Sequence, residues 1–71
     1  MDLRKWRHAV GVADNGSFTV AATRLHISQP ALSRSIQALE RELGLTLFER
    51  NAAGVVPSSA GQPILEQARA L

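Results

Sequence analysis

The chain has 71 residues, 45% of them hydrophobic and 20% charged, which is typical of one small globular domain rather than a disordered segment. It has no cysteine, which excludes disulfides and thiolate metal sites, and no apolar run of signal-peptide or membrane-span length, so we expect a cytoplasmic protein without a membrane partner. The net charge of +2 does not by itself indicate nucleic acid, although seven of the eight basic residues are arginine.

The first half of the chain predicts two helices. Leu3, Trp6, Val10 and Ala13 recur at helical spacing, which predicts a helix over residues 3–14 that stops at Asn15 and Gly16. Ser17 suits the next N-cap. A second stripe predicts a short second helix and contains Phe18, Ala21, Ala22 and Leu25. Its two alanines allow another helix to approach closely.

A third and longer helix follows a turn at His26, Ile27 and Ser28. Ser28 can cap it, and Pro30 is tolerated in a first turn, where its missing N–H has no intrahelical partner. The inward stripe is Leu32, Ile36, Leu39 and Leu43. Gly44 ends the run, so this helix is predicted over about residues 28–43.

The remaining segment predicts a hairpin and the start of a last helix. Residues 51–54 form a turn between two short strands, and the hairpin makes a wing over about residues 46–57. Ser58 can cap the last helix, in which Pro63 should distort the first turn. The fold class is therefore mainly α, a winged helix-turn-helix with a three-helix core, a short two-stranded wing and the start of a C-terminal linker helix. We expect a domain over residues 1–57 and a linker over residues 58–71.

The outer face of the third helix carries the functional prediction. At about 100° per residue, an inward leucine stripe places Pro30, Arg34, Gln37 and Arg41 outward, with Ser33 beside them. That face has no acid. Arginine can read guanine and glutamine can read adenine in the major groove of DNA, whereas an isolated helix with this pattern is more often only solvated. The helix-turn-helix arrangement with a wing favours double-stranded DNA as the partner.

The sequence also resembles a known family. The shared residues are Gly16-Ser17-Phe18-Thr19, Ala21-Ala22, Leu25, Ile27 to Ser33, Ile36, Leu39-Glu40, Leu43-Gly44, Leu47-Phe48 and Arg50. This pattern resembles the N-terminal domain of LysR-type transcriptional regulators. The resemblance implies a bacterial regulator whose third helix enters the major groove, whose wing lies along the minor groove and whose fourth helix pairs two subunits. It also implies a small-molecule effector bound by a further C-terminal domain.

Three groups of site residues follow from these arguments. The predicted base-reading residues are Gln29, Pro30, Ser33, Arg34 and Gln37. The predicted contacts to the DNA backbone are Ser17, Arg24, Ser28 and Arg50. The predicted dimerisation residues are Ile64, Leu65, Ala68 and Leu71, and we expect a homodimer that is weak in so short a chain. After Arg50 the wing is neutral, where the family usually has a second basic residue.

Other classes of function find little support. No catalytic arrangement, metal site or cofactor site is expected, because His8 and His26 lack partners at ligand spacing. Trp6 and Phe18 are expected in the core, and Arg4, Lys5 and Arg7 on a solvated face. Two alternatives stay open: a winged helix that binds only protein, and the similar domain of molybdate-responsive regulators.

Overall fold

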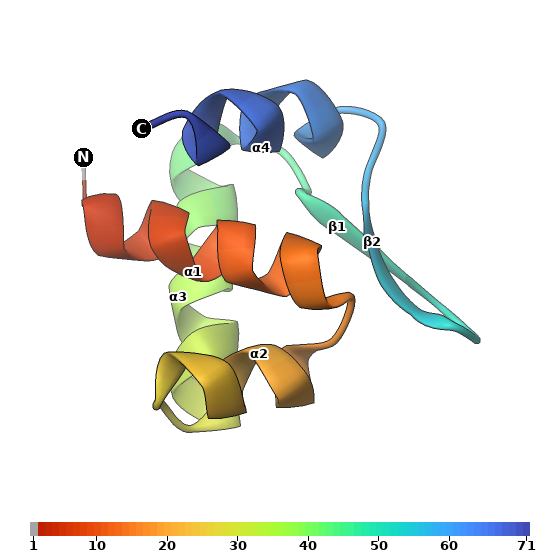
Figure 1. Ribbon diagram of the computed structural model, residues 1–71. Helices are drawn as coiled ribbons and strands as arrows, with labels where there is room; N and C mark the ends of the chain where they lie inside the picture. Colours follow the sequence, from red (N-terminus) through yellow and green to blue (C-terminus); the bar gives the residue numbers. More distant parts are fainter. Residues whose placement is uncertain (1) are drawn as a thin grey trace.

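The computed structural model describes residues 2–71. Three helices, α1 (Leu3–Asn15), α2 (Phe18–Leu25) and α3 (Gln29–Leu43), precede a hairpin of β1 (Phe48–Asn51) and β2 (Gly54–Pro57). The last helix is α4 (Gly61–Arg69). Figure 1 shows α1 crossing in front of α3, with α2 at one end of the molecule, α4 at the other and the hairpin projecting to one side. The predicted winged helix-turn-helix is confirmed.

Side-chain caps and glycines set the helix boundaries. The Ser17 hydroxyl accepts from the N–H of Val20 at 3.1 Å, and the Ser28 hydroxyl accepts from the N–H of Ala31 at 3.2 Å. Each bond satisfies an amide that has no partner inside its helix. Gly16 and Gly44 end α1 and α3 in the left-handed conformation, which a residue without Cβ adopts at little cost. These predicted starts and stops are confirmed.

The core lies where the three first helices cross. Its largest fully buried side chains are Leu32, Leu39, Leu47 and Val12. Ala9 and Ala21 are also completely buried, and their small side chains allow the helix backbones to approach closely. Trp6 and Phe18 belong to the same cluster, as predicted.

The hairpin is tied to the helices. Its strands are antiparallel, with Phe48 opposite Pro57 and Asn51 opposite Gly54. The N–H of Val55 donates to the carbonyl of Gly16 at 3.1 Å. Gly54 has a φ of 137°, and a Cβ there would lie 2.6 Å from the same Gly16 oxygen. The wing therefore packs directly against the junction of α1 and α2.

The last helix begins later than predicted. We expected it to start directly after Ser58, but α4 begins at Gly61, whose N–H donates to the Ser58 hydroxyl at 2.9 Å. The N–H of Gln62 already donates to the Ser58 carbonyl at 3.0 Å, and Pro63 has no N–H with which to continue this pattern to Ser59. The expected distortion takes the form of a turn at Ser59 and Ala60 before the helix.

Burial along α4 corrects a second expectation. Leu65 was expected to be exposed for dimerisation, yet it is only 2% exposed and belongs to the core with Ala68. Ile64 is half-buried, whereas Leu71 is 80% exposed. The apolar stripe of α4 serves the domain's own packing, against α1 and β2. The start of α1 and the end of α4 lie on the same side of the molecule, away from α2 (Figure 1).

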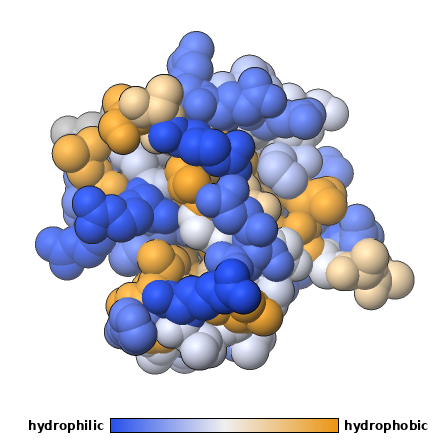
Figure 2. Space-filling model, viewed as in Figure 1, coloured by the Kyte–Doolittle hydropathy of each residue, from blue (hydrophilic) through white to orange (hydrophobic). Residues whose placement is uncertain are grey.

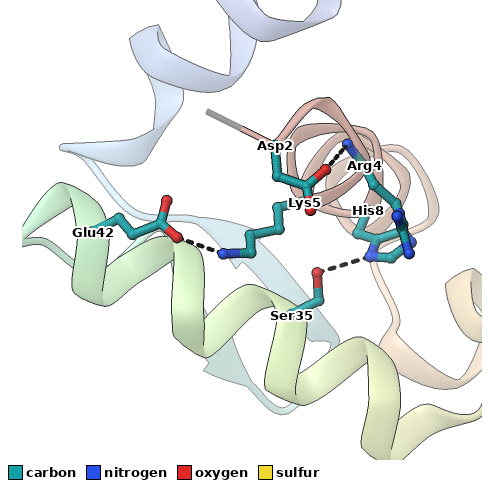
Figure 3. Close-up of polar contacts among 6 residues, drawn as sticks. All are labelled: Asp2, Arg4, Lys5, His8, Ser35 and Glu42. Atoms are coloured by element: carbon teal, nitrogen blue, oxygen red, sulfur yellow. Dashed lines mark hydrogen bonds and ion pairs between the residues drawn. The ribbon is translucent and has the colours of Figure 1, made fainter.

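Polar contacts also join α1 to α3 (Figure 3). Lys5 forms an ion pair with Glu42, so it is not simply solvated as expected, whereas Arg4 and Arg7 are exposed. Nδ1 of His8 lies 2.8 Å from the hydroxyl of Ser35. Burial, and next the positive charge of Arg4, lower the pKa of His8 from its ordinary value, which favours the neutral ring. Hydrophilic side chains cover most of the α1 side, with apolar side chains in separate patches (Figure 2).

Candidate nucleic-acid interface

The outer face of α3 is polar and accessible. Pro30, Arg34, Gln37 and Arg41 are exposed, as the helical spacing predicted, and Ser33 is half-buried at their edge. The opposite side of the helix is held in the core by Leu32, Ile36 and Leu39. This anchoring fixes the rotation of α3, so the arginine and glutamine side chains point away from the protein.

Both acids of α3 are held by groups within the domain. The carboxylate of Glu40 accepts from the backbone N–H of Leu47 at 2.7 Å. Glu42 pairs with Lys5 of α1. A carboxylate that faced a phosphate would repel it. These contacts instead engage both carboxylates within the domain, at the edges of the outer face. The face between them therefore presents Arg34 and Arg41 as its charged groups.

Arg50 of the wing is held over an aromatic ring. Its guanidinium carbon lies 4.6 Å from the centroid of the Phe18 ring. Phe18 in turn meets Phe48 edge-on, with centroids 6.2 Å apart. A cation above a ring face is attracted by the ring's negative π density, which orders the long arginine side chain. The charge of Arg50 thus lies next to the start of α2 rather than at the tip of the wing.

A shallow groove connects the two helix starts with the wing. Its lining includes Ser17, Thr19, Gln29 and Arg50, so residues distant in sequence share one surface. The capped starts of α2 and α3 direct backbone N–H groups outward, and such helix ends attract anions. A phosphate in this groove would meet N–H groups and a guanidinium.

The family relationship rests on a match over most of the chain. The model of the family described as "Bacterial regulatory helix-turn-helix protein, lysR family" matches residues 3–62. The chain belongs to the LysR family. Within that family it corresponds to the DNA-binding helix-turn-helix domain.

LysR-family relatives align along the whole chain. The regulator TfdT of Cupriavidus pinatubonensis is 52% identical over 71 residues, which are all of this chain and 31% of TfdT. The regulator ClcR of Pseudomonas putida is 51% identical over 71 residues and is covered to 24%. The chain thus spans less than a third of the length of these relatives.

Solved LysR-family structures have the same fold. A crystal structure of a complex of the CbnR DNA-binding domain with DNA matches 99% of this chain and 80% of that one, at 43% identity and a TM-score of 0.91. The BenM DNA-binding domain in complex with catB site 1 DNA matches 99% of this chain and 75% of that one, at 44% identity and a TM-score of 0.93. Both support the winged helix-turn-helix assignment.

The structure brings most of the predicted DNA-contacting residues together on this LysR-family domain. Ser33, Gln37 and Arg50 border a second hollow between α3 and β1. Arg24 is exposed in the last turn of α2, and Ser28 caps α3 beside Gln29. Two relationships were not predicted: the stacking of Arg50 on Phe18, and a hydrogen bond from Thr19 to Gln29. Each joins residues at least ten positions apart on different elements, which periodicity along one element does not report.

Across residues 2–71, no group of three or more His, Cys, Asp or Glu side chains is placed to hold a metal ion. Within the same residues, no helix is both long enough and apolar enough to cross a membrane.

Proposed function

We propose that this domain binds duplex DNA sequence-specifically by inserting α3 into the major groove and laying the wing, residues 46–57, along the minor groove. Gln29, Pro30, Ser33, Arg34 and Gln37 would meet base edges. Ser17, Arg24, Ser28 and Arg50 would contact the backbone. The observation that carries the proposal is the outer face of α3, which exposes Arg34, Gln37 and Arg41 while its flanking acids are held by Leu47 and Lys5.

Arg34 is the residue on which specificity should depend most. It is exposed one turn into α3, and arginine can donate two parallel hydrogen bonds to guanine O6 and N7. Backbone contacts from Ser17, Ser28 and Arg50 would set the depth and register of the helix without reading sequence.

We propose a homodimer as the binding state. The family resemblance supports this proposal, because it implies that the fourth helix pairs two subunits. Leu71 and the exposed part of Ile64 are available to a second copy, whereas Leu65 and Ala68 are occupied by the core. With so little free apolar surface on α4, self-association of these 71 residues should be weak. A small-molecule effector would bind outside this domain.

The proposed role is binding without catalysis, in the bacterial cytoplasm where the chromosome lies. The comparable relatives are transcriptional regulators. A winged helix that binds only protein would favour an apolar or acidic outer face on α3, and Arg34, Gln37 and Arg41 oppose that alternative.

Selection of bound duplexes from a random pool tests the proposal. We expect an enriched motif, and binding that weakens steeply as salt rises because phosphates exchange counterions for arginine. Arg34→Ala should lose about 1–3 kcal/mol on the selected site and relax preference at one base pair. Arg4→Ala is the matched control, because Arg4 is also exposed but lies on α1. Binding without sequence preference, or equal losses for both variants, would refute this assignment of Arg34.

A further inference from the structure

One side-chain contact joins α2 to α3 at the border of the reading face. The hydroxyl of Thr19, in the first turn of α2, donates to Oε1 of Gln29 over 3.1 Å. Both side chains are exposed, and both line the groove that holds Arg50. The contact therefore acts on a proposed base-reading side chain at the surface that DNA would cover.

Thr19 is the more firmly held partner of this pair. Its neighbour Phe18 is buried in the core, and the Ser17 cap closes the same helical turn. The backbone carbonyl of Thr19 accepts from the hydroxyl of Thr23 at 3.1 Å. A β-branched side chain also has few rotamers in a helix. Thr19 thus offers a hydroxyl at a nearly fixed place.

Gln29 has its freedom in the side chain rather than in the backbone. It is the first residue of α3, after the Ser28 cap and before Pro30, whose ring restricts the residue that precedes it. What remains variable is the direction in which the carboxamide presents its oxygen and its NH2 group. The hydrogen bond from Thr19 holds Oε1 toward α2, which leaves the NH2 group free to turn outward.

The direction of the carboxamide decides which base it can read. Reading adenine with two bonds requires Oε1 to accept from the adenine amino group while the NH2 group donates to N7. A glutamine whose oxygen is turned toward α2 presents its NH2 donors to the groove, because the oxygen accepts on the protein side. Guanine presents two acceptors there, thymine presents one, and the amino group of cytosine is itself a donor.

We propose that Thr19 is a positioning residue that makes Gln29 a reader of acceptor edges, guanine or thymine, in place of adenine. The inference rests on the proposed function, because it requires Gln29 to reach a base edge. Thr19 need not touch DNA for this role. It acts by holding Oε1 of Gln29 on the protein side of the groove.

The test compares base preference among matched variants of the 71-residue chain. Duplexes are selected from a random pool in parallel by the unaltered chain, Thr19→Val, Thr19→Ser and Gln29→Ala. Gln29→Ala identifies the base position that depends on Gln29. Thr19→Val keeps the branched shape and removes the donor, whereas Thr19→Ser keeps the donor.

The expected result is a change in preference at that single position. The unaltered chain and Thr19→Ser select guanine or thymine. Thr19→Val raises adenine relative to both by roughly two- to tenfold, the range expected for one hydrogen bond. Affinity for unselected duplex stays constant, because Thr19 carries no charge to exchange for counterions.

Several outcomes overturn the inference. Selection of adenine at that position by the unaltered chain would overturn it. So would a Thr19→Val variant that is folded, as its melting curve shows, and selects the same bases as the unaltered chain. If Gln29→Ala changes no position, Gln29 is not a base reader and the inference falls while DNA binding stands. If no sequence is enriched by the unaltered chain, the proposed function itself fails.

Discussion

Replacing Gly61 with alanine tests how closely α4 packs on the segment before the wing. A Cβ on Gly61 would lie 2.9 Å from the Cα of Leu47 and closer still to the Leu47 carbonyl oxygen. These are backbone atoms, and Leu47 is itself completely buried, so neither side can give way without moving α4 or β1.

The expected loss can be worked from two opposing terms. Forcing an extra methyl into a filled site costs about 1–3 kcal/mol, and contact with backbone places Gly61→Ala near the top of that range. Alanine gains at most about 1 kcal/mol over glycine inside a helix, and less at its first residue. A net loss of about 2 kcal/mol remains, which should lower the melting temperature of a domain this small by about 10 °C.

Gly11→Ala is the matched control for this experiment. A Cβ on Gly11 would meet the Cδ1 methyl of Leu25 at 3.0 Å, and that methyl is the end of a side chain that can turn aside. The gain in helix propensity offsets this small displacement, so stability should stay within about 1 kcal/mol of the unaltered chain. Melting followed by circular dichroism measures both variants. Equal melting temperatures for Gly61→Ala and the unaltered chain would refute the packing argument.

Three further predictions follow from the contacts described. Arg50→Gln should weaken binding to all duplexes alike and reduce the slope of log affinity against log salt by about 1, measured by titration; a sequence-dependent loss would contradict a backbone role. Because the pKa of His8 is lowered in the folded domain, the unfolded chain binds more protons than the folded chain as pH falls below about 6.5, so the free energy of unfolding should decline there. His8→Asn should remove that part of the decline, measured by urea unfolding at several pH values. Leu65→Ala should cost about 2–5 kcal/mol of stability, whereas the exposed Leu71→Ala should cost almost none; similar melting of the two would show that α4 does not complete the core.

Residue patterns along single elements predicted most of the fold. Ser17, Ser28 and Gly44 mark helix ends by local chemistry. The spacing of apolar residues within one helix shows which face of that helix turns inward. The outward face of α3 was predictable for the same reason. The start of α4 was not, because the sequence predicted a distortion at Pro63 without showing that the regular helix would begin only at Gly61.

The role of the apolar stripe on α4 was ambiguous for a physical reason. A face that packs on a neighbouring helix and a face that contacts a second subunit have the same spacing of apolar residues, so the sequence allowed either role for Leu65. The packing of α4 against α1 decides between them. The hydrogen bond from Thr19 to Gln29 and the stacking of Arg50 on Phe18 depend on how separate elements rotate against each other. That rotation is a property of the assembled core.

The location of both chain ends has a practical consequence. Leu3 at the start of α1 and Leu71 line one hollow beside α4, whereas the capped start of α3 lies at the opposite end of the molecule next to α2 (Figure 1). A fluorophore or affinity handle attached at either end would therefore stand clear of the surface proposed to meet DNA. Surface immobilisation through such a handle leaves α3 pointing into solution, which suits this domain to direct measurement of association and dissociation rates.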